Sequence, residues 1–92
     1  MIKSWNHKGL KRFYLFGDKS GIIAIHAKRL QVILQLLDAA DSPEKLNFPG
    51  FGFHKLKGDL KNYYSVTVKT NWRIIFQFDN QDAILVDYVD YH

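Results

Sequence analysis

The sequence contains no cysteine among its 92 residues. This absence excludes disulfide scaffolds, thiol nucleophiles and every cysteine-based zinc or iron site. The histidines show no His-x-x-x-His or similar ligand spacing, and His7 and His26 in particular stand apart from the others. Because zinc needs three or four ligands held together, we expect neither a metal site nor a cofactor. A protein without cysteine suits a reducing cytoplasm, which is where we expect it to act.

Long hydrophobic runs are also missing. No apolar stretch approaches the roughly 20 residues needed to span a bilayer, and the N-terminus lacks the order of charged, apolar and small residues of a signal peptide. We therefore expect no contact with a membrane. A chain of 92 residues is also short for more than one core, so residues 1–92 are expected to form a single domain.

Negative charge is scarce over most of the chain. Residues 1–73 hold all 13 Lys and Arg and five of the nine acidic residues, a balance of +8. Residues 74–92 hold the other four acidic residues and no Lys or Arg, a balance of −4, which gives the net +4. A basic surplus can serve solubility alone, but its concentration in one part of the chain favours a polyanionic partner.

Two helices are expected in the first half of the chain. Residues 2–5 are apolar enough to open a sheet, and the period then changes to that of a helix. Asn6 is a suitable N-cap for this first helix and Gly17 a suitable stop. A second helix should run from Ala27 to about Ala40, because apolar residues recur there at spacings of three and four. These residues are Ala27, Leu30, Ile33, Leu34 and Leu37.

The period changes to two after Phe53, beyond a loop marked by the two prolines, and this change predicts antiparallel strands. The alternating segments are 64–69, 72–78 and 83–88, with turn-forming residues at 79–82. The order strand, helix, helix, strand, strand, strand predicts an α+β domain with two N-terminal helices packed on a mainly antiparallel sheet. The other face of the sheet is then left for function.

Basic and titratable residues gather at three places in the second half. The segment 53–59 carries His54, Lys55 and Lys57 beside a glycine turn, which would form a cationic rim. In the segment 69–73, Arg73 alternates against apolar neighbours, so its planar guanidinium is a candidate to hold a phosphate. The sequence ends Asp90-Tyr91-His92, which crowds a carboxylate, a phenol and an imidazole into three positions.

Four motifs resemble the HigB branch of the RelE toxin superfamily, in the same order and over nearly the whole chain. They are Gly9-Leu10-Lys11-Arg12-Phe13, Lys57-Gly58-Asp59, Asn71-Trp72-Arg73-Ile74 and Asp87-Tyr88-Val89-Asp90-Tyr91-His92. The resemblance implies a microbial RNase-like fold and a ribosome-dependent endoribonuclease, a toxin that cuts messenger RNA in the ribosomal A site and so inhibits translation. It also implies a HigA-like helix-turn-helix antitoxin, which alone connects the toxin to operator DNA, and contacts with the 16S ribosomal RNA of the 70S ribosome.

Such a toxin has to cleave RNA through the RNA's own 2′-hydroxyl without a metal, which requires a base, an acid and charge stabilisation. His54 and His92 suit either proton transfer, because imidazole titrates near pH ~6.5, and the residue types alone do not assign the two roles. Asp90 can fix the tautomer of a nearby histidine or act as the base itself. Lys57 and Arg73 would neutralise the charge of the transition state.

The other predicted residues bind RNA rather than cut it. Tyr91, counted with the catalytic group, would stack on an unpaired base or position a phosphate oxygen. Cationic side chains would contact RNA phosphates without sequence choice. They are Lys8, Lys11, Arg12, Lys28, Arg29 and Lys55. Ordinary explanations stay open: charged residues are mostly solvated surface, Arg73 can pair with Asp59 or Asp87, and Tyr91 can cover the core. The functional alternative is a non-catalytic basic module that binds nucleic acid.

Overall fold

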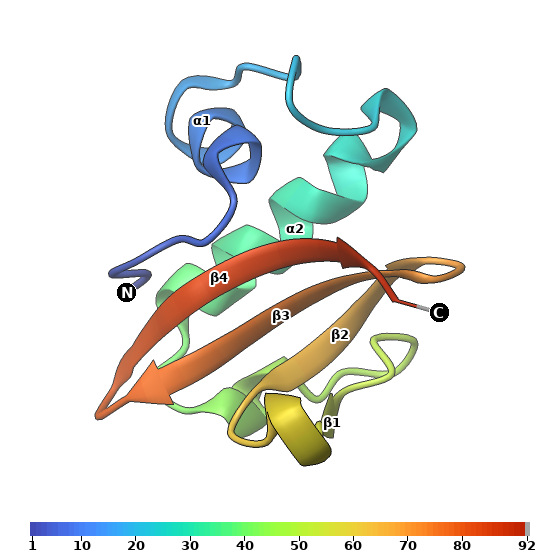
Figure 1. Cartoon of the computed structure of the whole chain (residues 1–92). Helices are drawn as coiled ribbons and strands as arrows, with labels where there is room; N and C mark the ends of the chain where they lie inside the picture. Colours follow the sequence, from blue (N-terminus) through green and yellow to red (C-terminus); the bar gives the residue numbers. More distant parts are fainter. Residues whose placement is uncertain (92) are drawn as a thin grey trace.

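The computed structural model describes residues 1–91, in which two α-helices precede a four-stranded antiparallel sheet (Figure 1). The helices are α1 (Lys8–Phe16) and α2 (Ala27–Ala39), and the short 3-10 helices are η1 (Ala24–His26), η2 (Pro43–Leu46) and η3 (Gly58–Leu60). The strands, side by side in this order, are β1 (His54–Lys55), β2 (Tyr64–Lys69), β3 (Trp72–Asp79) and β4 (Asp82–Asp90). The expected α+β class is confirmed.

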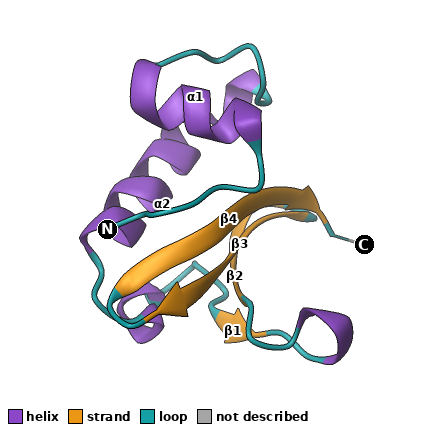
Figure 2. Ribbon diagram, turned by 60° about the vertical axis from the view of Figure 1, so that its left-hand side comes forward, coloured by secondary structure: helices purple, strands orange, loops and turns teal. Residues whose placement is uncertain are grey.

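Both α-helices lie on the same side of the sheet, which we call the helix face (Figure 2). The predicted apolar stripe of α2 is fully buried there, at Leu30, Ile33, Leu34 and Leu37. The sheet contributes Val66, Ile74, Phe76 and Val86 to the same core. Each such side chain stabilises the fold by about 1.5–3 kcal/mol when fully buried. The centre of the helix face is therefore packed core.

The N-terminal segment does not form the strand expected at residues 2–5. It runs parallel to β4 and makes only isolated bridges, Ile2 with Ala83 and Trp5 with Val86. A bulge in β4 interrupts the pairing between these bridges, because Leu85 has a φ of 55° and its N–H donates to Ser4 Oγ at 2.8 Å. The Ser4 hydroxyl thus accepts the hydrogen bond of the Leu85 N–H, which a backbone carbonyl would accept if the strand pairing were continuous.

The start of α1 also differs from the prediction. The N-cap is His7, whose Nδ1 accepts from the Leu10 N–H at 2.9 Å, and not Asn6. Asn6 is still part of the extended segment, since its backbone N–H donates to the Val86 carbonyl at 2.9 Å. The predicted stop is confirmed: Gly17 has a φ of 74° and its N–H donates to the Phe13 carbonyl.

The edge strand β1 has two residues and pairs with β2 through His54 opposite Ser65 and Lys55 opposite Tyr64. The turn between β3 and β4 lies at the predicted residues 79–82, and its first and last residues, Asp79 and Asp82, pair with each other. No helix among residues 1–91 is long and apolar enough to cross a bilayer. The fold thus leaves one face of the sheet without an α-helix over it.

Candidate active site

The strand register places His54 and Arg73 on the same side of the sheet. Residues directly opposite one another in antiparallel strands share a face. The register aligns His54 with Ser65, Ile75 and Asp87, and it aligns Thr67 with Arg73 and Val89. These residues turn away from the helix face, and we call their side the far face. His54 and Arg73 lie two strands and two residues apart, so their Cα atoms are about 12 Å apart on a flat sheet.

His54 is exposed, and its ring is oriented by the backbone. Its Nδ1 lies 2.9 Å from the Gly52 carbonyl oxygen. Because a carbonyl oxygen only accepts, Nδ1 carries the hydrogen, and Nε2 has the lone pair when the ring is neutral. Gly52 has a φ of 58°, and a Cβ at this position would lie 2.8 Å from Thr67 Oγ1. Glycine is therefore required where the chain presents the carbonyl that holds His54.

Arg73 is half-buried at the turn that joins β2 and β3. Its Nη1 donates to the carbonyls of Thr70 and Trp72. The ion pairs found in residues 1–91 do not join it to Asp59 or Asp87, the two partners considered from the sequence. Both recorded bonds use one nitrogen of the guanidinium, so the far face holds a cation that is positioned by neutral groups.

The other two basic residues of the predicted rim lie near the outer edge of the sheet. Lys57 is exposed and extended, with φ −126° and ψ 173°, directly before η3. Lys55 is exposed on β1, opposite Tyr64, with its Nζ 6.0 Å from the centre of the Tyr64 ring. The rim therefore follows β1 towards η3, while Arg73 lies two strands further in.

The C-terminal residues divide between the two faces. Asp90 pairs in register with Trp72, whose ring packs on the core, so Asp90 lies at the helix-face side of the sheet end and is exposed. Tyr91 donates its N–H to the Asn71 carbonyl at 2.8 Å and returns to the far face by alternation. His92 lies outside the described residues. The register thus places His54, Arg73 and Tyr91 on the far face, while Asp90 lies at the end of the sheet on its helix-face side.

The cationic residues of the two helices have unequal surroundings. Lys8, Lys11 and Lys28 are exposed, as an electrostatic contact with RNA requires. Arg12 pairs with Asp18 at 3.4 Å on the surface. Arg29 has internal contacts that account for it without RNA.

Arg29 ties a loop to the sheet. Its Nη2 donates to the carbonyls of Gly50 and Thr67, each at 3.0 Å, and its guanidinium carbon lies 4.5 Å from the centre of the Phe51 ring. The loop that precedes β1 is therefore attached to β2. This loop includes Gly52, whose carbonyl orients His54. Arg29 thus supports the far face from the other side of the sheet.

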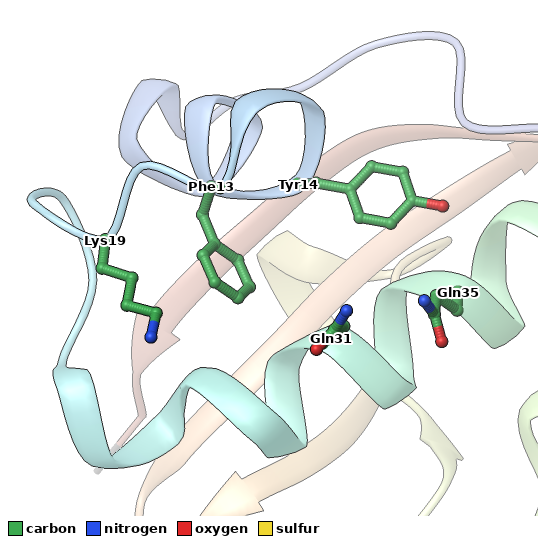
Figure 3. Close-up of a pocket in the computed structure, with 6 residues that line it drawn as sticks. Phe13, Tyr14, Lys19, Gln31 and Gln35 are labelled. Carbon is green, nitrogen blue, oxygen red and sulfur yellow. The ribbon is translucent and has the colours of Figure 1, made fainter.

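The predicted catalytic residues among positions 1–91 lie on the surface of the sheet and at its edge rather than in a pocket. A pocket of about 400 Å³ lies between α1 and α2, where Phe13 and Tyr14 face Gln31 and Gln35 (Figure 3). A second one near β1 includes Lys55 and Tyr64 in its lining. Of the predicted catalytic residues within the described part of the chain, none lines either of these pockets. Among residues 1–91 no group of three or more His, Asp or Glu side chains could hold a metal ion. An open surface suits a polymer such as RNA.

Two buried polar side chains near the site were missed by the sequence reasoning. Ser65 pairs with His54 and is fully buried, and its Oγ has no hydrogen-bond partner among the described residues. Its alternation with Tyr64 and Val66 was the one signal that it shares the face of His54. His26 has no metal-ligand spacing that would indicate a role, yet it is buried beneath the end of β4.

Comparisons with known proteins agree with this architecture. A family model described as RelE-like toxin of type II toxin-antitoxin system HigB matches residues 3–92. The chain is 47% identical over 92 residues to Endoribonuclease HigB of Proteus vulgaris, with 100% of both proteins covered. It is 40% identical over 94 residues to Toxin HigB-1 of Vibrio cholerae, with 100% of this chain and 98% of that protein covered.

Solved structures share the fold at low sequence identity. A chain of the YoeB-YefM complex from Staphylococcus aureus superimposes with a TM-score of 0.64 and 16% identity, covering 100% of this chain and 98% of the other. A mutant of YafQ from E. coli gives a TM-score of 0.55 and 16% identity, covering 98% and 93%. The expected RelE-like fold is confirmed. With the family model matched over nearly its whole length, the chain belongs to the HigB-like family, the RelE-like toxins of type II toxin–antitoxin systems.

Proposed function

We propose that this chain, as one toxin domain, is an endoribonuclease that cleaves messenger RNA in the ribosomal A site and thereby inhibits translation. The observation that carries the proposal is the far face, where an imidazole with a defined tautomer and a guanidinium share one open surface. The full-length identity of 47% to a protein named Endoribonuclease HigB supports the same activity.

The proposed chemistry starts at His54. Its Nε2 takes the proton of the 2′-hydroxyl, and the 2′-oxygen attacks the adjacent phosphorus atom. The bond from phosphorus to the 5′-oxygen breaks, and that oxygen takes a proton from an acid at the C-terminal end, from Tyr91 or His92, while Asp90 would fix the tautomer of a nearby histidine. The products are a 2′,3′-cyclic phosphate and a 5′-hydroxyl. Every proton and electron pair is accounted for by the RNA and the protein, without a metal or a cofactor.

Cationic residues would stabilise the charge that accumulates on the phosphate. Arg73 is held at the turn by carbonyl groups, so its remaining N–H groups are oriented before RNA arrives. Lys57 would approach from the rim near η3. Removing one fixed donor of this kind costs about 10²- to 10³-fold in rate in comparable sites.

The partners follow from the family and the surface charge. A type II system pairs the toxin with an antitoxin, and we propose a HigA-like helix-turn-helix protein that alone contacts operator DNA. In the cytoplasm, exposed lysines of the two helices, together with Lys55, would attach the toxin to 16S ribosomal RNA by phosphate contacts.

The test compares one messenger RNA on purified 70S ribosomes and free in solution. We expect cleavage within the A-site codon only on the ribosome, with products that end in a 2′,3′-cyclic phosphate. A matched RNA with a single 2′-deoxy nucleotide at the cut position should resist cleavage there. Equal cutting of the deoxy RNA would overturn the proposed chemistry. Binding without any cut would favour the basic binding module.

A further inference from the structure

A buried imidazole lies directly beneath the end of β4. His26, at the junction of η1 and α2, is 4% exposed, and its Nδ1 lies 2.6 Å from the Tyr88 hydroxyl. Its ring meets the rings of Trp72 and Tyr88 edge-on, with centroids 5.9 and 6.0 Å apart. The rings of Trp72 and Tyr88 also contact each other, with their centroids 4.6 Å apart. The three rings form one cluster, which we call the His26 cluster.

The His26 cluster contains both immediate neighbours of Asp90 on the helix face. Trp72 is opposite Asp90 in the register, and Tyr88 precedes Asp90 by two residues on the same side of β4. The backbone of Asp90 is therefore flanked by the rings of Trp72 and Tyr88, and both rings pack against His26. A shift of either ring moves the end of β4, which also carries Tyr91.

The hydrogen bond within the cluster is directional. Burial lowers the pKa of His26, and the positive charge of Lys69 lowers it further, so the ring is neutral at neutral pH. Burial raises the pKa of Tyr88, so its phenol keeps its proton. The Tyr88 hydroxyl therefore donates to Nδ1 of His26. The backbone of Ile23 lowers the pKa of Tyr88, but by less than burial raises it.

The connection between α1 and α2 leads directly to the His26 cluster. Gly9 and Gly21 cross in backbone contact, and a Cβ on Gly9 would lie 2.6 Å from the Gly21 carbonyl oxygen. The connection therefore stays close against α1 before Ile23 and η1. At the start of α1, the ring of His7 lies 5.4 Å from the ring of Tyr88. The start of α1, the connection between α1 and α2, and β3 thus all contact Tyr88.

We propose that His26 is a positioning residue that sets the place of Asp90 and Tyr91 through Tyr88 and Trp72, without touching RNA itself. The inference rests on the proposed function, in which the end of β4 belongs to the active site. It differs from a purely structural role because it predicts a loss in the cleavage step beyond any loss in stability.

The test uses the full chain with purified ribosomes and messenger RNA. The variants are Tyr88→Phe, which removes only the hydroxyl, His26→Leu, which removes the acceptor, and His26→Asn, whose side-chain oxygen can replace Nδ1. The matched control is Tyr14→Phe, because the Tyr14 hydroxyl donates to Asp38 at 2.9 Å. Asp38 also binds the N–H of Ile2, which bridges to Ala83 at the opposite end of β4.

Three quantities are measured for each variant: the maximal single-turnover cleavage rate, the toxin concentration that gives half of it, and the free energy of unfolding in urea. We expect Tyr88→Phe and His26→Leu to lower the maximal rate about 10- to 100-fold, as small misplacements of catalytic groups do, with the half-saturating concentration nearly unchanged. His26→Asn should recover most of the rate. In labelled protein, the amide signals of Asp90 and Tyr91 should shift in Tyr88→Phe and stay in place in Tyr14→Phe.

The outcomes separate the inference from the function on which it rests. If Tyr88→Phe cleaves as fast as Tyr14→Phe, while Asp90→Asn is inactive, the positioning role is wrong and the active site stands. If Asp90→Asn, Tyr91→Phe and His92→Gln all keep the full rate, both are wrong. Should His26→Leu fail to fold, Tyr88→Phe and His26→Asn still decide the matter, since both keep the cluster filled.

Discussion

On the helix face, the side chains next to Asp90 are fixed by burial, since Tyr88 and His26 are both nearly inaccessible and are joined by a short hydrogen bond. On the far face, His54 is exposed and Arg73 half-buried, and each is oriented by bonds to backbone carbonyls. Burial fixes a side chain but closes it to RNA. A carbonyl leaves the side chain accessible while it restricts its direction. The buried residues of the helix face therefore support the site, and the accessible residues of the far face are available to contact RNA.

The largest effect that tests this division is expected at His54. His54→Asn keeps an amide group near the Gly52 carbonyl but has no counterpart of Nε2, so the orientation survives and the proposed base is lost. We expect cleavage on the ribosome to fall by about 10²-fold or more, the usual contribution of a general base. The free energy of unfolding should hardly change, because the side chain is exposed. If His54→Asn cleaves at the wild-type rate, the far face does not supply the base.

Arg29 tests whether a cation on the helices serves the fold or the RNA. Arg29→Met keeps the apolar stem and removes the bonds to the carbonyls of Gly50 and Thr67. Hydrogen bonds to a charged group contribute about 1.5–3 kcal/mol each where buried, and this group is half-exposed, so we expect a loss of about 1–3 kcal/mol in urea unfolding. Lys28→Met, at the exposed neighbour, should leave stability unchanged. It should instead weaken the salt dependence of ribosome binding by a slope of about 1. Reversed results would show that Arg29 is the RNA contact.

Local patterns predicted the elements whose causes are local. The apolar spacing of α2 and the stop at Gly17 depend on a few neighbouring residues, and both are confirmed. The N-cap was placed one residue early because β4, far along the chain, takes the N–H of Asn6. The same holds for the side on which Asp90 lies. Counting by twos from Ala83 would put Asp90 on the far face, but the bulge at Leu85 reverses the alternation.

The site was predictable in its residue types more than in its arrangement. The motifs indicated His54 and Arg73, and the register places both on one face. Nothing in the spacing of His26 indicated its contact with Tyr88, which joins positions 62 residues apart. The orientation of His54 depends on Gly52 and on the strand packed against it, which a linear sequence does not display.

The pH dependence of stability should report the His26 cluster. The charged or titratable groups near His26 are Tyr88 on β4 and Lys69 on β2, and His7 at the start of α1 lies beside Tyr88. Because the pKa of His26 is lowered from 6.5 in the folded protein, the unfolded chain binds more protons below pH 6.5. The free energy of unfolding should therefore fall as the pH drops through about 6.5 towards the folded pKa, and be regained above it.

His26→Asn, which does not titrate, should flatten this part of the curve, measured by urea unfolding between pH 5 and 8. Asp18, whose pKa is lowered by hydrogen bonds that its carboxylate accepts from Ser20, acts in the same direction but below pH 3.8, outside this window. A His26→Asn variant that retains the full slope would show that other groups cause it and that the pKa of His26 is not lowered in the folded protein.

The smallest effect is expected at Ser65. Here the comparison is between its buried hydroxyl on the far face and the buried hydroxyl of Tyr88 on the helix face. The Tyr88 hydroxyl has a partner, whereas Ser65 Oγ has none among residues 1–91. A buried polar group without a partner costs about 1–3 kcal/mol, and a made hydrogen bond contributes about 1 kcal/mol. Ser65→Ala should therefore leave the free energy of unfolding unchanged or raise it by up to about 1 kcal/mol, while Tyr88→Phe lowers it. A loss of stability in Ser65→Ala would mean that the hydroxyl is bonded in solution, through a water molecule next to His54, and the far face would then have a polar support of its own.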